Sequence, residues 1–193
     1  MKSQNKEYWI EKMENLVEEQ LEASTKIFQN LHEEALVFSD SRTWSAAACI
    51  DHLNSYFNYY LPRIKKVMAS QKPINDPTSI KLSWIGVYFI KMMKPIENGK
   101  KFKAMKKHYP NIQSTDPHQI VANFIHNLEE MLLILSQANQ IDLNRGSFRS
   151  SISPLVNLRP CDTIEFLLVH NQRHLIQAKN QLKEYRNNLS VEK

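Results

Sequence analysis

The stretch that decides the fold covers residues 166–177 and reads FLLVHNQRHLIQ. Its apolar residues recur at helical spacing, with polar residues between them. Asp162 precedes it as a predicted helix cap, and Glu165 would complete a capping box. The pattern predicts a long amphipathic helix from about Asp162 to about Asn187.

Three further segments predict long amphipathic helices. Residues 4–32 carry apolar side chains three or four positions apart. Ser45 can cap a second helix, which Pro62 is expected to kink or interrupt. Asp116 and Pro117 predict the start of a third, with Asp116 as cap. Four such helices without alternating strand patterns indicate an all-α four-helix bundle, and we expect one domain over residues 1–193.

The connections between these helices are long enough for crossovers. Residues 72–77 contain two prolines and predict a loop, whereas 82–93 form a strongly apolar run that we interpret as a buried helix or packed segment. Residues 139–160 contain Gly146, two prolines and several serines, and predict a mostly irregular connection.

Two histidines of the fourth helix, His170 and His174, are four positions apart. They therefore project to one side of the helix, about 40° from one another, and can bind the same metal ion. Apolar residues on that side indicate that both face the bundle interior. Buried imidazoles need hydrogen-bond partners or a metal, so a pair of hydrogen-bonded core histidines is the alternative.

A third inward ligand would favour the metal site. His52 and Cys49 on the second helix and His126 on the third are the candidates, although His126 falls about 100° beyond the apolar stripe, toward solvent. We expect surface or loop positions for the other histidines, His32, His108 and His118.

Two motifs resemble those of a known family. Residues 44–53, WSAAACIDHL, resemble the W-S-x-x-E-x-x-x-H-L opening of the second helix in the DinB/YfiT-like superfamily. Residues 170–177, HNQRHLIQ, resemble the H-x-x-R-H-x-x-Q signature of its fourth helix. Ala48 stands where the family often has Glu, which weakens a helix cap rather than a ligand.

The resemblance implies a DinB-like four-helix bundle that holds a divalent metal, commonly nickel or zinc, with three histidines. On this chain the ligands would be His52, His170 and His174. Three neutral imidazoles leave a coordination position for water or substrate. The implied activity is that of a metal-dependent enzyme activating a thiol or water, as a thiol-dependent S-transferase using a low-molecular-weight thiol or as a hydrolase. The family also implies a possible homodimer.

Other residues near these motifs have two interpretations each. Gln177 could orient a ligand or contact a neighbouring helix, and Arg173 could hold an anionic substrate group or form a surface ion pair. Cys49 is interpreted as a small buried residue rather than a ligand or nucleophile. Four aromatic residues could line a pocket or form core: Tyr56, Tyr59, Trp84 and Tyr88.

Composition excludes several classes of protein. The 193 residues include three widely separated glycines, so neither a dinucleotide-binding fingerprint nor a phosphate-binding loop is present. Two cysteines are too few for a disulfide framework, and the N-terminus does not resemble a signal peptide, so we expect a cytoplasmic protein. The run at 82–93 is too short to cross a bilayer, and we expect no membrane partner.

The net charge of +5 comes from one segment. Residues 91–107 contain seven lysines and one acidic residue, a net charge of +6, so the rest of the chain sums to −1. We interpret Lys91–Lys107 as a solvated connection, which makes nucleic acid an unlikely partner; an anion-binding segment is the alternative. A small-molecule substrate fits the histidine site better. The alternative to an enzyme is a non-catalytic bundle that binds a small ligand or a protein partner.

Overall fold

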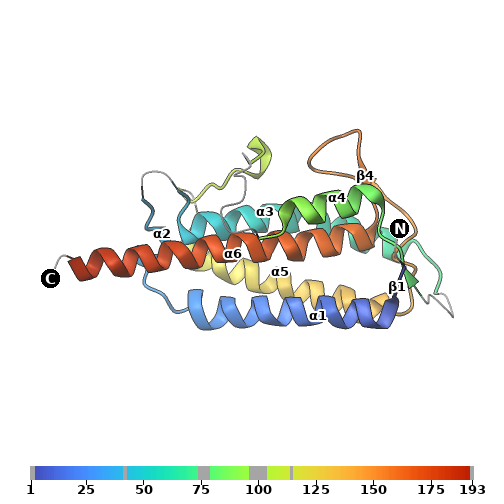
Figure 1. Ribbon diagram of the computed structural model, residues 1–193, viewed down its shortest axis with the longest axis horizontal. Helices are drawn as coiled ribbons and strands as arrows, with labels where there is room; N and C mark the ends of the chain where they lie inside the picture. Colours follow the sequence, from blue (N-terminus) through green and yellow to red (C-terminus); the bar gives the residue numbers. More distant parts are fainter. Residues whose placement is uncertain (1–2, 41–42, 74–78, 96–103, 114, 192–193) are drawn as a thin grey trace.

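The computed structural model describes residues 3–40, 43–73, 79–95, 104–113 and 115–191. Four long helices form the bundle: α1 (Lys6–Ala23), α3 (Ala46–Ala69), α5 (Pro117–Ala138) and α6 (Pro160–Val191). Each of α1 and α3 packs against both α5 and α6 (Figure 1). The predicted all-α four-helix bundle with long connections is confirmed. Helix α6 continues past the ends of the other helices toward the C-terminus (Figure 1).

Shorter elements lie in the connections. A π-helical turn (Ser24–Phe28) and α2 (Glu33–Val37) follow α1, so residues 4–32 are not the single α-helix that we predicted. Helix α4 (Trp84–Met93) packs on α6, and the 3₁₀ turn η2 (Lys106–His108) packs on α3. Two antiparallel pairs of two-residue strands join segments outside the helices: β1 (Gln4–Asn5), which precedes α1, with β2 (Ser79–Ile80), and β3 (Phe148–Arg149) with β4 (Asn157–Leu158).

The predicted caps of two helices are confirmed. Ser45 Oγ accepts a hydrogen bond from the Ala48 amide, and Asp116 Oδ1 accepts one from the His118 amide. These side chains satisfy amides that have no carbonyl partner inside their own helices. Helix α3 runs through Pro62 without interruption.

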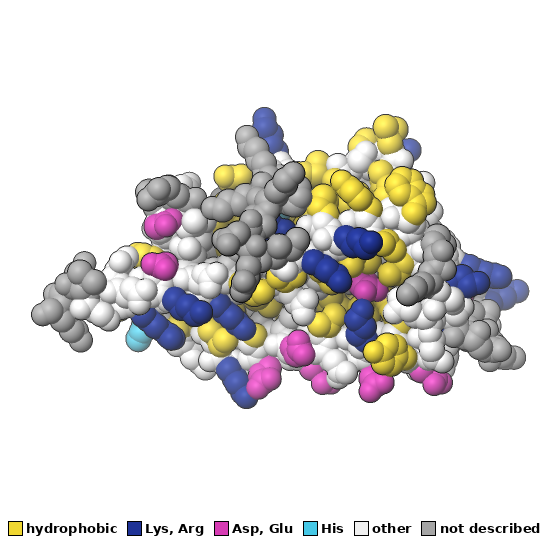
Figure 2. Space-filling view, viewed as in Figure 1, with side chains coloured by type: hydrophobic (Ala, Val, Ile, Leu, Met, Phe, Trp, Pro, Cys, Tyr) yellow, Lys and Arg dark blue, Asp and Glu magenta, His cyan; other side chains and the backbone are white. Residues whose placement is uncertain are grey.

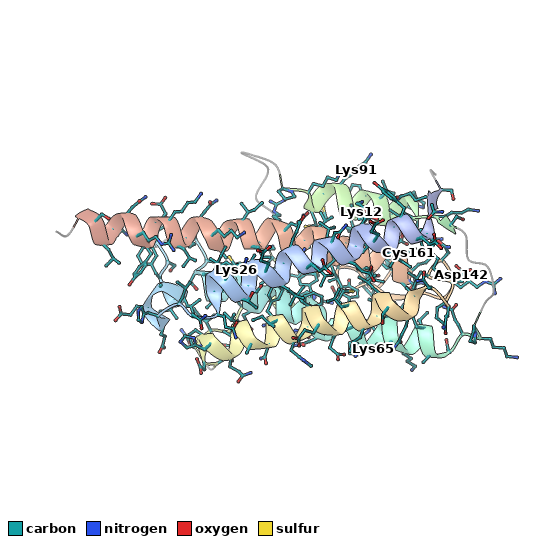
Figure 3. All side chains as sticks on the ribbon, turned by 90° about the horizontal axis from the view of Figure 1, so that it is seen from below. Lys12, Lys26, Lys65, Lys91, Asp142 and Cys161 are labelled. Atoms are coloured by element: carbon teal, nitrogen blue, oxygen red, sulfur yellow. The ribbon has the colours of Figure 1, made fainter. Side chains whose placement is uncertain are left out.

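The predicted cap of the fourth helix is wrong. Helix α6 begins at Pro160, two residues earlier, and Pro suits the first helical position because its missing N–H would have no partner there. Asp162 accepts its shortest hydrogen bonds from the backbone amide and hydroxyl of Ser83, at 2.7 and 2.8 Å, and longer ones from the amide and Nε of Arg159, at 3.4 and 3.2 Å. Glu165 does not complete a capping box, since its carboxylate accepts from Trp9 and Lys12 of α1. Figure 3 shows Lys12 on α1.

Helix α4 is confirmed as a helix over most of 82–93, but it is buried on one face only. Gly86, Phe89 and Ile90 face the bundle, while Trp84 and Tyr88 are 74% and 58% exposed. Hydrophobic side chains over α4 are visible on the molecular surface, with lysine and arginine side chains among them (Figure 2). Within the described residues, no helix has the length and apolar character needed to cross a membrane.

Candidate metal centre

Three histidines from two neighbouring helices meet inside the bundle. His52 lies on α3, and His170 and His174 lie one turn apart on α6. One ring nitrogen of each histidine faces the other two residues, and these three nitrogens all lie within 4.8 Å of one another. The ring centroids are 4.6 Å apart for His52 and His174 and 5.2 Å apart for His52 and His170. The structure therefore brings together the three residues that the family motifs indicated.

The hydrogen bonds of these rings fit a metal ligand set. Nδ1 of His52 lies 2.6 Å from the carbonyl oxygen of His108. A carbonyl can only accept, so Nδ1 carries the hydrogen and Nε2 of the neutral ring has the free lone pair. Nδ1 of His170 and Nδ1 of His174 are buried and have no hydrogen-bond partner among the described residues. Ring nitrogens of neutral imidazoles without a hydrogen-bond partner are the donors that a divalent metal ion can bind, so these residues fit the metal that the motifs imply.

Burial keeps the three imidazoles neutral. Loss of hydration is the largest cause of the lowered pKa of each ring. The pKa of His174 falls to about 3, with the neighbouring His52 as a further cause and a hydrogen bond with Gln177 opposing it. The pKa of His170 falls well below its ordinary value. Because imidazole must be neutral to bind a metal, this set is ready to bind one near pH 7.

Aromatic rings enclose the histidines. Trp44 lies 4.9 Å from His52 and stacks over His174 at 6.0 Å, measured between ring centroids. Tyr56 lies 4.6 Å from His170, and Phe166 stacks on the same ring at 5.6 Å. These side chains limit water around the rings and orient them, as the surroundings of a metal site must. Tyr56 thus borders the site, whereas Trp84 and Tyr88, which we considered as pocket residues, are exposed on α4.

Sequence reasoning missed one histidine of this region. We expected His108 at the surface or in a loop, but its side chain is only 2% exposed. Its ring stacks on Tyr56 with centroids 3.8 Å apart, and burial lowers its pKa to about 4. His108 sits in a lysine-rich segment without helical periodicity, so no spacing marked it as inward facing. The exposed positions expected for His32, His118 and His126 are confirmed.

The two other candidate residues lie around the histidines. Arg173 Nη1 donates a 3.4 Å hydrogen bond to the carbonyl of Met92 at the end of α4. This contact attaches α4 to α6 and does not depend on a substrate. Gln177 is half-buried one turn after His174, with which it interacts.

Cys49 and the lysine segment do not join the histidine cluster. Burial raises the pKa of the Cys49 thiol to about 12, which opposes formation of a thiolate and agrees with a small buried residue. Lys106 and Lys107 are exposed, and the Lys107 ammonium lies 5.1 Å from the Tyr59 ring centroid. Residues 96–103, with three of the lysines, lie outside the described part of the chain.

Comparison with known protein families agrees with the resemblance of the two motifs. A family model described as the DinB superfamily matches residues 16–178, which include all three histidines. The chain belongs to the DinB superfamily. No curated protein and no solved structure was found to match it. The activity of this DinB superfamily member must therefore be argued from its own site.

Proposed function

We propose that this DinB superfamily member is a metal-dependent enzyme whose divalent ion is bound by His52, His170 and His174. The observation that carries the proposal is the convergence of three neutral imidazoles, those of the buried His52 and His170 and of the half-buried His174, two of which have a buried Nδ1 without a described partner. A pair of core histidines held by hydrogen bonds would not leave these nitrogens unpaired. Nickel and zinc are the proposed ions because imidazole ligands suit both.

The proposed chemistry is activation of a thiol or of water. A divalent ion with three histidine ligands keeps a coordination position open and lowers the pKa of a thiol or water placed there. The enzyme would then be an S-transferase that uses a low-molecular-weight thiol, or a hydrolase, acting on a small molecule.

The chain itself contributes orientation and exclusion of water. Trp44 and Tyr56 cover the histidine rings, and the carbonyl of His108 holds the orientation of His52. Gln177 lies beside His174, where its amide can bind a polar group of the substrate. Arg173 already binds the end of α4, so we propose that it supports the site wall rather than contacting substrate.

Elemental analysis tests this proposal. Protein produced without a histidine tag or added metal should contain about one transition metal ion per chain. His52→Ala and His174→Ala should lose the ion, whereas His126→Ala, which changes an exposed histidine, should retain it. Wild-type protein that stays metal-free during titration with nickel and zinc would overturn the proposal and favour a non-catalytic, ligand-binding bundle.

Substrate assays then distinguish the two reactions. Metal-loaded protein should be offered an electrophile with a panel of low-molecular-weight thiols, and separately a set of esters and amides without thiol. Thiol-dependent turnover that is lost in His174→Ala supports the transferase, and turnover without thiol supports the hydrolase. If neither reaction occurs above the rate of His174→Ala, the proposed enzyme class is wrong.

A further inference from the structure

A connection outside the four long helices forms a hydrogen bond with a proposed metal ligand. The 3₁₀ turn η2 lies between α4 and α5, and its last residue is His108. The carbonyl oxygen of His108 accepts the hydrogen bond from Nδ1 of His52 at 2.6 Å. The partner that fixes this ring therefore comes from a segment 56 positions away, not from the helix that carries His52.

The side chain of the same residue attaches η2 to α3. Its ring stacks on Tyr56 with an interplanar angle of 23°, and its Nδ1 lies 3.0 Å from Ser55 Oγ. Ser55 has a single hydroxyl hydrogen, which it donates to the carbonyl of His52 at 2.6 Å. His108 Nδ1 must then be the donor to Ser55 Oγ. Ring and carbonyl of His108 thus contact one turn of α3, residues 52–56.

The residues beside His108 make other contacts. Lys107 lies 5.1 Å from the Tyr59 ring centroid, Tyr109 packs edge-on against Trp44 at 5.5 Å, and the Asn111 amide donates a 2.8 Å hydrogen bond to Asp51. Lys106 and Lys107 of η2 are exposed, and Tyr109 is 58% exposed. His108 is the buried residue of the turn, and its Nε2 has no hydrogen-bond partner among the described residues. The stack on Tyr56 and the Ser55 contact are the attachments made by the residue whose own carbonyl binds His52.

We propose that His108 is a positioning residue, whose side chain anchors η2 so that its own carbonyl holds His52 with the hydrogen on Nδ1 and the lone pair on Nε2. A neutral imidazole can carry its hydrogen on either nitrogen, and the hydrogen bond made by one nitrogen decides which remains available. Without the anchor, His52 would lose its fixed acceptor and populate both forms. The inference deepens the proposed function, because an Nε2 ligand is useful only if a metal ion binds.

The first test uses metal-free protein at pH 7.5, where the proposed function plays no part. Two-bond proton–nitrogen NMR spectra of the imidazoles, assigned with His52→Gln, report which nitrogen carries the hydrogen. Wild-type protein should show His52 protonated at Nδ1. His108→Ala should show a mixture, and His108→Phe, which preserves a ring to stack on Tyr56, should retain more of the Nδ1 form. His126→Ala is the matched control, and its spectrum should show His52 protonated at Nδ1 as in the wild type.

The second test is metal affinity, measured by competition with a chelator for nickel or zinc. His108→Ala should bind about 10- to 100-fold more weakly, as is usual when the partner of a histidine ligand is lost. His108→Phe should lose less metal affinity than His108→Ala, and His126→Ala should bind the metal as tightly as the wild type. An unchanged affinity in a folded His108→Ala, or wild-type His52 with its hydrogen on Nε2, would overturn the inference. If the wild type binds no metal, the proposed function fails, and the NMR result still decides whether His108 positions His52.

Discussion

Trp9 and Glu165 are 156 positions apart, and Nε1 of the indole donates a 2.8 Å hydrogen bond to the glutamate carboxylate inside the bundle. The other carboxylate oxygen pairs with Lys12 at 3.0 Å, so α1 neutralises and binds a nearly buried charge of α6. Trp9→Phe should leave one buried oxygen without its donor. We expect the free energy of unfolding to fall by about 1–3 kcal/mol in urea denaturation.

Two variants check that assignment. Tyr8→Phe, at an exposed neighbouring position, should change the free energy of unfolding by less than about 0.5 kcal/mol. Trp9→Phe combined with Glu165→Met should cost less than the sum of the single changes, because no buried carboxylate is then left unpaired. Strict additivity would show that the hydrogen bond contributes nothing to stability.

The close approach of Gly86 to Asp162 gives a second prediction. A Cβ at position 86 would lie 2.3 Å from Asp162 Oδ1, and the carboxylate cannot retreat because it binds Ser83. Ala ordinarily stabilises a helix relative to Gly by about 0.5–1 kcal/mol. Here we expect Gly86→Ala to lower the melting temperature and to increase hydrogen exchange in α4.

The same substitution should cost less in a second background. Asp162→Ala removes the two closest carboxylate atoms and leaves only the Cβ of residue 162, 2.8 Å from the added Cβ, so Gly86→Ala should be less destabilising there than in the wild type. If Gly86→Ala destabilises both backgrounds equally, the contact with Asp162 is not the cause.

The lowered pKa values of the buried histidines predict acid sensitivity of the metal-free protein. An unfolded histidine titrates near pH 6.5, whereas the pKa of His108 in the folded protein is about 4 and that of His174 about 3. Below pH 6.5 the unfolded chain therefore binds more protons, and stability falls as the pH falls. For each such histidine, the free energy of unfolding should fall by up to about 1.4 kcal/mol per unit decrease in pH.

Urea denaturation at pH 7, 6 and 5 measures this effect above the range where most carboxylates titrate. His108→Phe should reduce the slope by the share of one histidine, and His126→Ala should leave it unchanged because that ring is exposed. A stability that stays constant from pH 7 to pH 5 would contradict the buried, neutral state of the cluster.

Lys6 joins α1 to the end of α5. Its buried ammonium donates hydrogen bonds to the carbonyls of Asn139 and Ile141, at 3.2 and 2.7 Å, where α5 has ended. Lys6→Met should retain the apolar contacts but leave two carbonyls unpaired, which costs about 1–3 kcal/mol in thermal or urea unfolding. Lys26→Met is the control, since Lys26 is exposed and, among the described residues, forms its ion pair with Glu22, four positions before it. Equal effects of the two substitutions would contradict the role given to Lys6.

The bundle could be predicted from sequence because its helices carry periodic apolar stripes and local caps. The caps at Ser45 and Asp116 act within three residues, so the sequence alone contains them. Asp162 has the same chemistry as a cap and accepts hydrogen bonds from Arg159, three residues before it, but its two shortest hydrogen bonds come from Ser83, 79 positions away. No local pattern separates a carboxylate that caps its own helix from one that binds another segment.

The residues of the candidate site could likewise be predicted from sequence only in part. His170 and His174 could be paired from their spacing, and His52 was joined to them by the family motif. His108 could not be found, because its burial depends on Tyr56 and Ser55 of a distant helix rather than on its own neighbours. The two-residue strand pairs were missed for a similar reason, since two residues are too few to establish an alternating pattern.

The distribution of the three histidines along the chain also orders the assembly of the site. His52 belongs to the first third of the sequence, while His170 and His174 lie on the last helix, which packs against α1, α3 and α4. During synthesis from the N-terminus, His52 is made and its helix can fold long before its partners exist. No group that needs all three rings can bind before α6 has left the ribosome and docked, so occupancy of the site would report completed folding of the four-helix bundle.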